Sequence, residues 1–586
     1  MKRFVSIFLT VALLLFTVAC SGSGAKKGES QASKSDSSTP DRSTASSSTS
    51  SETSDISLPV LSPDNPVTLS LWLTTNHSAP ASDNKLTKLL KDKLGVTLIY
   101  EIITPDNADQ KTGVMLAGGE YPDLIGATDN NARFITGGAL IPLDDYLKPG
   151  VADILYEHVK PYWNRMAFDA GDGSGKHIYI LPNYNRYYGD ITGGTNYSAS
   201  GFWIQKAVLE EAGYPDLSDM TLEKYFKLIE DYMKKHPTID GQPTIGFEIL
   251  AAPGREWGLT NPPQYLNGAP NNGGVIVDEN NHASIFADKD IAKRYYKFLN
   301  EMNAKGLIDR ESLTQTLDQY LAKIATGRVL GMYDQRWNFG NAHDALVSAG
   351  KYERTYVSLM PVYEGKTPYY ADREVMNINQ GFGVSVSCKH PDVAVSFLNT
   401  MLSEEWQKIL SWGIEGEDYL VGPDGRFTRT EEQRANSRDL VWKASNRLEA
   451  LLDLLPKHQG TFSDGNAFGP DDQPEEFFET LTEYDKNFLT AYGKKTWRDF
   501  LNKPPENPVY YPAWNIALPD GSEAQMANKQ LTDTALQYLP KAILADPKDF
   551  ESIWAEYVEA ISRINVKAYE DAINEGIQER IKNWSN

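Results

Sequence analysis

Cysteine is almost missing from this chain. Only Cys20 and Cys388 occur among 586 residues. Because we interpret Cys20 below as a lipid attachment site, Cys388 has no partner for an intrachain disulfide, and the folded part must be stabilised by packing. Cys388 ends the alternating run Gly-Val-Ser-Val-Ser-Cys, which predicts a strand. We therefore interpret it as a buried structural thiol rather than a nucleophile.

Positive charge is scarce as well. The chain has 57 Lys and Arg against 79 Asp and Glu, which gives a formal net charge of −22. An acidic surface argues against nucleic acid as a partner and against direct binding to anionic lipid headgroups. The charge balance therefore predicts ligands that are uncharged or cationic.

The common motifs of catalysis are also absent. The sequence has no His-Glu-x-x-His, no Gly-x-Ser-x-Gly and no Cys-x-x-Cys, and its eight histidines are scattered singly. We expect no enzyme activity, no metal site and no cofactor. Glycoside hydrolysis by two carboxylates stays open, because paired carboxylates are abundant in so acidic a chain.

Long hydrophobic runs are limited to the N-terminus. One uncharged apolar run covers residues 4–19, after Lys2 and Arg3 and before Cys20. A basic start, an apolar core and a small residue before a cut predict an export signal in residues 1–19. The end of this run, Thr17-Val-Ala-Cys20, resembles the lipobox at which bacterial lipoproteins are cut and lipidated. An ordinary signal peptide or a membrane helix are the alternatives, but a span needs about 20 apolar residues.

Aromatic residues are missing between Phe16 and Trp72. Residues 21–55 instead contain fourteen Ser and four Thr. Such a segment buries too little apolar surface to offset its ordering entropy, so we expect a disordered, lipid-anchored tether over 20–62. The folded body then begins near residue 63. It is too long for one hydrophobic core, which predicts at least two lobes.

Strand and helix patterns alternate from residue 67 onward. Residues 67–73 and 96–102 alternate like strands around a helix that is marked by leucines at 86, 89, 90 and 94. Helical spacing recurs at 222–233 and 291–302, and the last sixty residues are helical in pattern. Alternating strands and helices predict an α/β protein with a mostly parallel sheet that is covered on both faces.

Seven short motifs in this order resemble the family 1 extracellular solute-binding proteins of bacterial ABC importers. They cover most of residues 65–425. The motifs are Met115-Leu-Ala-Gly-Gly-Glu-Tyr-Pro-Asp-Leu-Ile, Gly138-Ala-Leu-Ile-Pro-Leu-Asp-Asp-Tyr, Gly175-Lys-His-Ile-Tyr-Ile-Leu-Pro, Phe202-Trp-Ile-Gln-Lys-Ala-Val-Leu-Glu-Glu-Ala-Gly, Ala325-Thr-Gly-Arg-Val-Leu-Gly-Met, Pro391-Asp-Val-Ala-Val-Ser-Phe-Leu-Asn and Trp412-Gly-Ile-Glu-Gly-Glu-Asp-Tyr. The last is typical of large lipoprotein members that bind oligosaccharides.

The resemblance implies a periplasmic-binding-protein type II fold, in which two α/β lobes hold a ligand between them. We expect a first lobe from 63–187 and 380–412, and a second from 188–379 and 413–586 with a helical C-terminus. Chain crossings are expected near 182–188, near 379–384 and after 412. Some large members also bind calcium, but here residues 236–246 lack the acidic ladder.

One further stretch is similar to a calcium loop. Asp464, Asn466, Gly469 and Glu475 match positions 1, 3, 6 and 12 of an EF-hand, but Phe468 occupies a ligand position. We therefore expect no calcium there.

Aromatic residues are the feature that points to a ligand. A sugar ring has an apolar C–H face and a hydroxyl rim, so its site needs flat aromatic side chains flanked by polar ones. The candidates in Gly-, Pro- or Asn-rich stretches are Trp257, Trp337, Trp412 and Trp514. A tryptophan is also a common core residue. Of the four, Trp337 fits a core position least well, because it follows the predicted strand 329–333 and has polar neighbours.

Polar candidates follow from position. Each lies after a strand, at a presumed crossing or beside a candidate tryptophan, and each could equally be a turn or surface residue. They are Asn76, Asn183, Arg186, Asp334, Arg336 and Glu415.

Together these features predict a monomeric, lipid-anchored solute-binding protein at the extracellular face of the membrane. It would capture an oligosaccharide or related polyhydroxylated solute. By resemblance, its partners are two permease subunits and a cytoplasmic ATPase pair. The alternatives are a surface polysaccharide hydrolase and a peptide-binding importer component.

Overall fold

A computed structural model describes residues 56–183, 195, 197, 200–370, 378, 380–457, 460–501 and 513–584. The export signal, Cys20 and Arg186 lie outside these residues. The chain divides into Met1–Asp55 and Ile56–Asn586, and the described residues all belong to the second unit. The folded body begins before residue 63, because Leu58 and Leu61 pack against a hydrophobic core and Ser396 Oγ donates a 2.7 Å hydrogen bond to the Pro59 carbonyl.

The first sheet has the strand order β2-β1-β3-β15-β6. Its strands are β1 (Val67–Thr74), β2 (Val96–Ile103), β3 (Leu124–Thr128), β6 (Leu181–Pro182) and β15 (Gln380–Val384). The predicted βαβ opening is present, because β1 pairs in parallel with both β2 and β3. However, β15 is antiparallel to β3 and to β6, so the sheet is mixed. The strand predicted up to Cys388 ends at Val384.

Both faces of the first sheet are covered by helices, as predicted. Leu69, Leu71 and Leu73 of β1 share one core with α1 (Lys85–Leu94), α13 (Pro391–Met401), α14 (Glu404–Ser411) and α17 (Glu449–Leu454). Trp72 points the other way, where its ring meets Phe134 of α3 (Asn131–Thr136) edge-on, beside α2 (Pro105–Gly118). The alternation of β1 thus buries both of its faces.

The α1 helix shows how local sequence sets these positions. Asn84 caps it by accepting a 2.9 Å hydrogen bond from the Thr87 amide. Gly95 ends it in the left-handed region at φ 69°. A Cβ atom at residue 95 would lie 2.3 Å from the Ser62 carbonyl oxygen, so the close approach of the residues before β1 also requires glycine here.

The second sheet has the order β10-β13-β7-β14. Its strands are β7 (Ser200–Gln205), β10 (Ile245–Glu248), β13 (Val329–Gln335) and β14 (Tyr356–Leu359). Strand β10 is parallel to β13, whereas β7 is antiparallel to β13 and β14. Among its helices are α6 (Lys206–Glu211), α7 (Leu222–Lys235), α10 (Asp290–Ala304), α11 (Leu317–Ala325) and α12 (Arg336–Ser348). The spacing of apolar residues predicted α7 and α10 to within a few residues.

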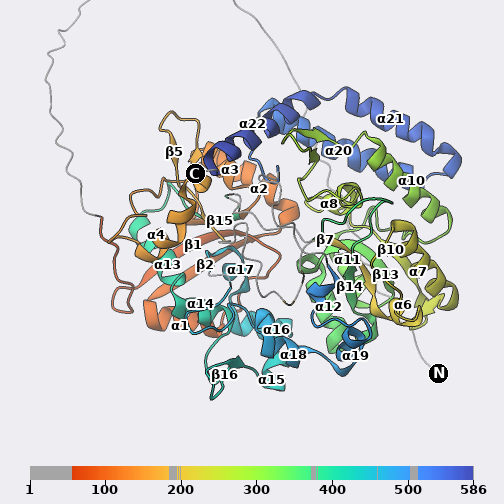
Figure 1. The fold of residues 1–586 in the computed structure, drawn as a ribbon. Helices are drawn as coiled ribbons and strands as arrows, with labels where there is room; N and C mark the ends of the chain where they lie inside the picture. Colours follow the sequence, from red (N-terminus) through yellow and green to blue (C-terminus); the bar gives the residue numbers. More distant parts are fainter. Residues whose placement is uncertain are drawn as a thin grey trace, which may run out of the picture. The chain divides into compact units, whose positions relative to one another are not determined.

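The C-terminal helices belong to the second core. They are α20 (Glu523–Leu544), α21 (Phe550–Ser562) and α22 (Val566–Trp584), and they bury Leu539, Trp554 and Ile577. Figure 1 shows them in blue, with α20 and α21 beside α10 and α22 against α20. By contrast, residues 448–455 share a core with the first sheet, so the predicted lobe boundary after 412 differs from the division between the cores. The leucines of α17 are the reason.

Shorter elements connect these parts. They are α4 (Asp153–Val159), α5 (Trp163–Met166), β4 (Phe168–Asp169), β5 (Lys176–His177), β8 (Thr238–Ile239), β9 (Gln242–Pro243), α8 (Trp257–Thr260), α9 (Pro262–Leu266), β11 (Val275–Val277), β12 (Ala283–Ile285), β16 (Leu420–Val421), β17 (Phe427–Thr428), α15 (Glu431–Asn436), α16 (Leu440–Asn446), α18 (Pro474–Thr480) and α19 (Glu483–Ala491).

Cys388 lies half-buried after β15, and burial raises the pKa of its thiol to about 11. The thiol is therefore protonated at neutral pH, which agrees with a structural role.

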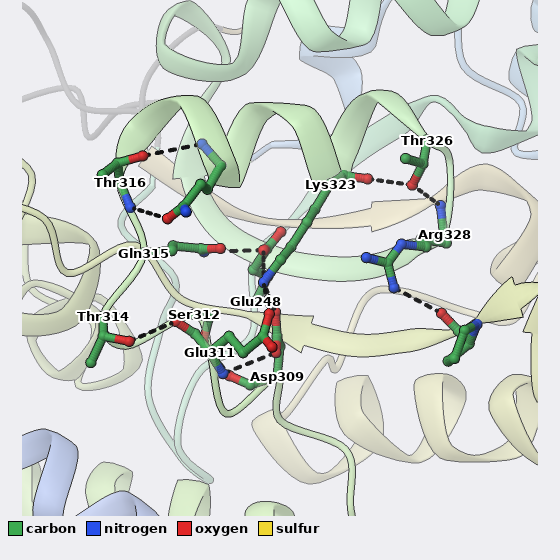
Figure 2. A network of polar contacts seen from close by, with 12 residues as sticks. Glu248, Asp309, Glu311, Ser312, Thr314, Gln315, Thr316, Lys323, Thr326 and Arg328 are labelled. Atoms are coloured by element: carbon green, nitrogen blue, oxygen red, sulfur yellow. Dashed lines mark hydrogen bonds and ion pairs between the residues drawn. The ribbon is translucent and has the colours of Figure 1, made fainter. Parts of the chain in front are cut away.

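A buried carboxyl ends strand β10. Glu248 Oε1 accepts a 3.0 Å hydrogen bond from Gln315, and the Lys323 ammonium lies 3.8 Å away (Figure 2). Lys323 is held more tightly by Asp309, at 2.6 Å, and also reaches Glu311, at 3.3 Å. Because burial outweighs these contacts, the pKa of Glu248 is raised to about 8.

This raised pKa predicts a loss of stability with rising pH. The folded state binds the Glu248 proton more tightly than the unfolded chain does, so its contribution is complete below pH 4.5 and falls as the pH rises to about 8. Glu248→Gln copies the protonated form. It should remove this slope and, at pH 8, stabilise the protein by on the order of a few kcal/mol in urea unfolding.

Glu311→Gln is the matched control. It alters the same network at an 83 % exposed side chain and should leave the slope unchanged. If wild type and Glu248→Gln lose stability in parallel from pH 5 to 8.5, Glu248 is ionised in the folded protein and the interpretation is wrong.

Candidate ligand-binding site

The two sheets meet at the ends of their strands. Asn76 follows β1, and Arg255 lies in the segment after β10. The Arg255 Nη2 donates a 2.9 Å hydrogen bond to Asn76 Oδ1 and so joins the two sheets. Asp129 follows β3, and Asp334 lies near the end of β13. Crevices beyond the carboxyl ends of strands are where open α/β sheets bind ligands.

Arg255 is the centre of the contacts between these strand ends. Its side chain is buried, Nε donates to Asn338 Oδ1 at 3.0 Å, and Nη1 donates to the Gly254 carbonyl at 2.7 Å. Its guanidinium lies 5.4 Å from the ring centroid of Trp337. Burial lowers the pKa of Arg255, while the charges of Asp334 and Asp129 raise it. Arginine nevertheless stays charged at neutral pH.

Two tryptophans form an aromatic surface beside Arg255. Trp257 begins α8 and Trp337 is the second residue of α12. Their ring centroids are 5.9 Å apart, Trp257 is half-buried, and Trp337 remains 47 % exposed. An indole that is held by an arginine and a second indole, yet open to solvent, offers a preformed apolar plate to a ligand.

Carboxylates and amides lie around this plate. Buried Asp334 accepts hydrogen bonds from the Tyr320 hydroxyl at 2.6 Å and from the Asn338 amide at 3.1 Å. Burial raises the pKa of Asp334 to about 6. Asp129 accepts a 3.2 Å hydrogen bond from Asn515.

Asp129 is a carboxyl at the end of β3 with a perturbed pKa. Its side chain is exposed to solvent, yet desolvation by the surrounding protein raises its pKa to about 6. An aromatic plate with polar groups around it is a common form of small-molecule site.

A second polar group lies at the strand ends of the first sheet. Thr75 Oγ1 donates to Asp453 Oδ2 at 2.8 Å, and Asn183 Nδ2 donates to the Asp453 carbonyl at 2.9 Å. His77 lies 3.5 Å from Glu449. Burial opposes ionisation of Glu449, but His77 and nearby Lys443 lower its pKa to about 2. This group holds the Glu449 carboxylate beside His77, the residue that follows Asn76.

The structure thus brings several of the predicted residues together. Asn76, Trp257, Asp334 and Trp337 meet around Arg255, and Asn183 lies in the neighbouring polar group. Trp514 is half-buried, and its carbonyl accepts a 2.9 Å hydrogen bond from Arg580. Its neighbour Asn515 is the residue that reaches the site. Arg186 lies outside the described residues.

Three predicted residues are elsewhere. Trp412 is fully buried with Tyr419 and Phe427, and its Nε1 donates to the Ala467 carbonyl at 3.0 Å, so it is a core residue. Glu415 lies exposed in the turn after it. Arg336 points along α12 to Asp344, at 3.0 Å, because this partner lies two turns further along the same helix.

Sequence reasoning missed Arg255 and Asp129. Arg255 stands two residues before Trp257 in the segment that drew attention to the tryptophan. Asp129 directly follows a recognisable buried strand, so the rule that places ligands beyond strand ends, which selected Asn76, also applied to it. The sequence gives no such signal for Asn338, because its hydrogen bond with Arg255 depends on how the segment after β10 packs against α12.

The described residues contain no group of three or more His, Cys, Asp or Glu side chains that could hold a metal ion. In the stretch similar to a calcium loop, Asp464 pairs with Lys408 at 2.7 Å and Glu475 with Arg426 at 3.2 Å. Both of the matching carboxylates thus have lysine or arginine as partners.

Fold and site together define an α/β protein in which residues from the strand ends of two sheets meet around Arg255. The model of the bacterial extracellular solute-binding protein family matches residues 79–408, more than half of the chain. The chain therefore belongs to this family, and the resemblance of the seven motifs is confirmed. Among the described residues, no helix is both long enough and apolar enough to cross a bilayer.

One curated relative supports the same family. The fructooligosaccharide ABC transporter substrate-binding protein FusA of Streptococcus pneumoniae serotype 4 (strain ATCC BAA-334 / TIGR4) is 26 % identical over 270 residues. The matched region covers 44 % of this chain and 47 % of FusA, about half of each.

Solved structures of solute-binding proteins share the fold. S. pneumoniae FusA in complex with kestose has a TM-score of 0.62 at 15 % identity, over 88 % of this chain and 100 % of that one. Alginate-binding protein AlgQ2 without calcium ion has a TM-score of 0.61 at 14 % identity, over 88 % and 98 %. The predicted two-lobed α/β fold is therefore confirmed.

Proposed function

We propose that this chain is the substrate-binding component of an ABC importer and that it captures an oligosaccharide. The observation that carries the proposal is the Trp257–Trp337 pair, which lies where the strands of both sheets end. Sugar rings stack their C–H faces on such plates and exchange hydrogen bonds with carboxylates and amides at the rim. Asp129, Asn76 and Asn515 supply such a rim here.

The relatives point in the same direction. The relatives described above are a fructooligosaccharide-binding protein, whose structure contains kestose, and an alginate-binding protein, and all of these ligands are saccharides. The aromatic plate favours this class over peptides, whose capture relies on backbone hydrogen bonds or on charged clamps for their ends. In this proposal the protein binds and releases its ligand and catalyses nothing.

Trp337→Ala tests the aromatic plate. Loss of an exposed anchor should weaken oligosaccharide binding by about 1 to 3 kcal/mol, roughly five- to 150-fold in Kd, and leave the fold intact. Binding is measured by calorimetry after a thermal-shift screen with kestose, nystose, gluco- and manno-oligosaccharides, uronate oligomers and peptides.

Trp163→Ala is the matched control, since Trp163 is a half-buried tryptophan of α5. It should leave Kd unchanged. The proposal fails if no saccharide shifts the melting temperature while a peptide does. If Trp337→Ala binds the oligosaccharide as tightly as the wild type does, the aromatic plate is not the binding surface.

We also propose that lipid on Cys20 anchors the protein at the extracellular face, where two permease subunits with their ATPase pair receive the ligand. The support is the apolar run, the small residues before Cys20 and the Ser-rich stretch after it. Such an anchor keeps a binding protein close to its permease.

Cys20→Ala tests the anchor. The variant should fail to incorporate radiolabelled fatty acid and should appear in the medium instead of the membrane fraction. Cys388→Ala, which removes the other cysteine, should stay in the membrane fraction. Equal membrane retention of Cys20→Ala and wild type would contradict lipid attachment at this residue.

A further inference from the structure

A small pocket lies where α1 begins. Its volume is about 190 Å³, and its walls come from the first residue of α1, the turn at 417–418, α15 and α16. It shares no lining residue with the group around Arg255. Pockets for drug-sized ligands have volumes of about 300 to 1,000 Å³, so this pocket has room for a single ring.

A buried ion pair forms one wall of the pocket. Lys85 Nζ donates to both carboxylate oxygens of Asp418, at 2.8 and 2.7 Å, and the Asp418 side chain is 3 % exposed. Gln433 is fixed as well, because its Nε2 donates to the Glu417 carbonyl at 2.8 Å and its Oε1 accepts from the Thr430 amide at 2.8 Å. This part of the pocket is therefore formed before any ligand binds.

Trp442 supplies an aromatic wall. Asp439 caps α16 by accepting a 2.6 Å hydrogen bond from the Trp442 amide, which places the tryptophan in the first turn of the helix. The indole is half-buried, and the Arg447 guanidinium and the Lys85 ammonium lie 5.0 and 5.9 Å from its ring centroid. An indole that is held in this way offers an apolar surface to a sugar ring.

Two asparagines of the pocket have hydrogen-bonding atoms that the protein does not use. The Asn436 side chain makes no hydrogen bond to any of the described residues. Asn446 Nδ2 donates to the Trp442 carbonyl at 2.8 Å, which leaves Asn446 Oδ1 as an acceptor. Both side chains are half-buried and not fully enclosed, so a ligand can reach them. Together they can donate to and accept from hydroxyl groups.

The cations around the pocket already have partners within the protein. Lys85 binds both oxygens of Asp418, and Arg447 donates to the Trp412 carbonyl at 2.9 Å. What remains for a ligand is an indole and the two amides. An uncharged ring with an apolar face and hydroxyl groups around its edge matches this lining, and sugar rings have this form.

We propose that this pocket is a second carbohydrate site, which binds one uncharged sugar ring. The proposal goes beyond the function proposed above, which needs only the residues around Arg255. Because a single ring buries little surface, its Kd should be about 1 mM. The terminal ring of a longer saccharide fits the pocket in the same way.

Fluorine NMR on protein that is labelled with 5-fluorotryptophan tests this site, and Trp442→Phe identifies the resonance of residue 442. Methyl glycosides of glucose, galactose, mannose, fructose and N-acetylglucosamine are titrated to about 100 mM, roughly 100 times the expected Kd. At least one of them should shift the Trp442 resonance with saturation. Asn436→Ala should weaken this binding about two- to tenfold, which corresponds to the loss of one hydrogen bond.

Asn528→Ala is the matched control, since Asn528 is an exposed asparagine of α20. It should leave the Kd that is measured at Trp442 unchanged. The same titration in Trp337→Ala shows whether the pocket acts by itself. A saturating shift with the wild-type Kd in that variant supports a second site.

The contradicting results separate this site from the proposed function. If none of the sugars shifts the Trp442 resonance, or if Asn436→Ala binds like the wild type, the second site is wrong and oligosaccharide capture around Arg255 still stands. If the shift disappears in Trp337→Ala, the pocket belongs to the first site and is not a separate one. If calorimetry detects no oligosaccharide binding but the Trp442 shift remains, the proposed function fails and the second site stands.

Discussion

The structure of the site depends on one buried guanidinium. Arg255 reaches Asn76 at the end of the first sheet, Asn338 on α12 and the face of Trp337. A buried charge is tolerated only when it is paired and hydrogen-bonded. These contacts satisfy Arg255, and in return they fix the aromatic plate relative to the strand ends of both sheets. Without this residue, Asp334 would keep a buried carboxyl and lose its nearby counter-charge.

This arrangement allows one ligand to contact side chains from both sheets. Trp257 and Trp337 lie in the segments that follow β10 and β13 of the second sheet. Asn76 and Asp129 follow β1 and β3 of the first sheet. A ligand that touches both sets gains interactions that neither sheet provides alone. Ligand-driven closure requires such a difference, because a ligand shifts a conformational equilibrium only by its differential affinity for the two states.

Much of the fold could be predicted from the sequence, because the spacing of apolar residues along these strands and helices agrees with the faces that the fold buries. The alternation of residues 67–73 belongs to a strand that is buried on both faces, and the apolar spacing of 222–233 belongs to the buried face of a helix. Both elements formed as predicted. Trp412 could not be placed. A Gly-Ile-Glu turn after a tryptophan looks the same in sequence whether the ring faces a ligand or, as here, packs against Tyr419 and Phe427.

The site was predictable where a local rule applied. Asn76 and Trp337 follow strands and Asp334 lies near the end of one, and the carboxyl ends of parallel strands gather at one edge of a sheet. Arg255 and Asn338 are 83 residues apart in the chain, and their 3.0 Å hydrogen bond results from the tertiary fold. No pattern within either segment encodes such a contact.

The central claim is that one oligosaccharide contacts the strand ends of both sheets, and solution scattering tests it most directly. The radius of gyration of the folded body is measured with and without an oligosaccharide. The oligosaccharide is added at a concentration that saturates the protein, as established by calorimetry. The account predicts a smaller radius of gyration with the ligand, because only a more closed form lets both walls touch the same sugar. An unchanged radius at saturation would contradict it and would indicate a rigid, preformed cleft.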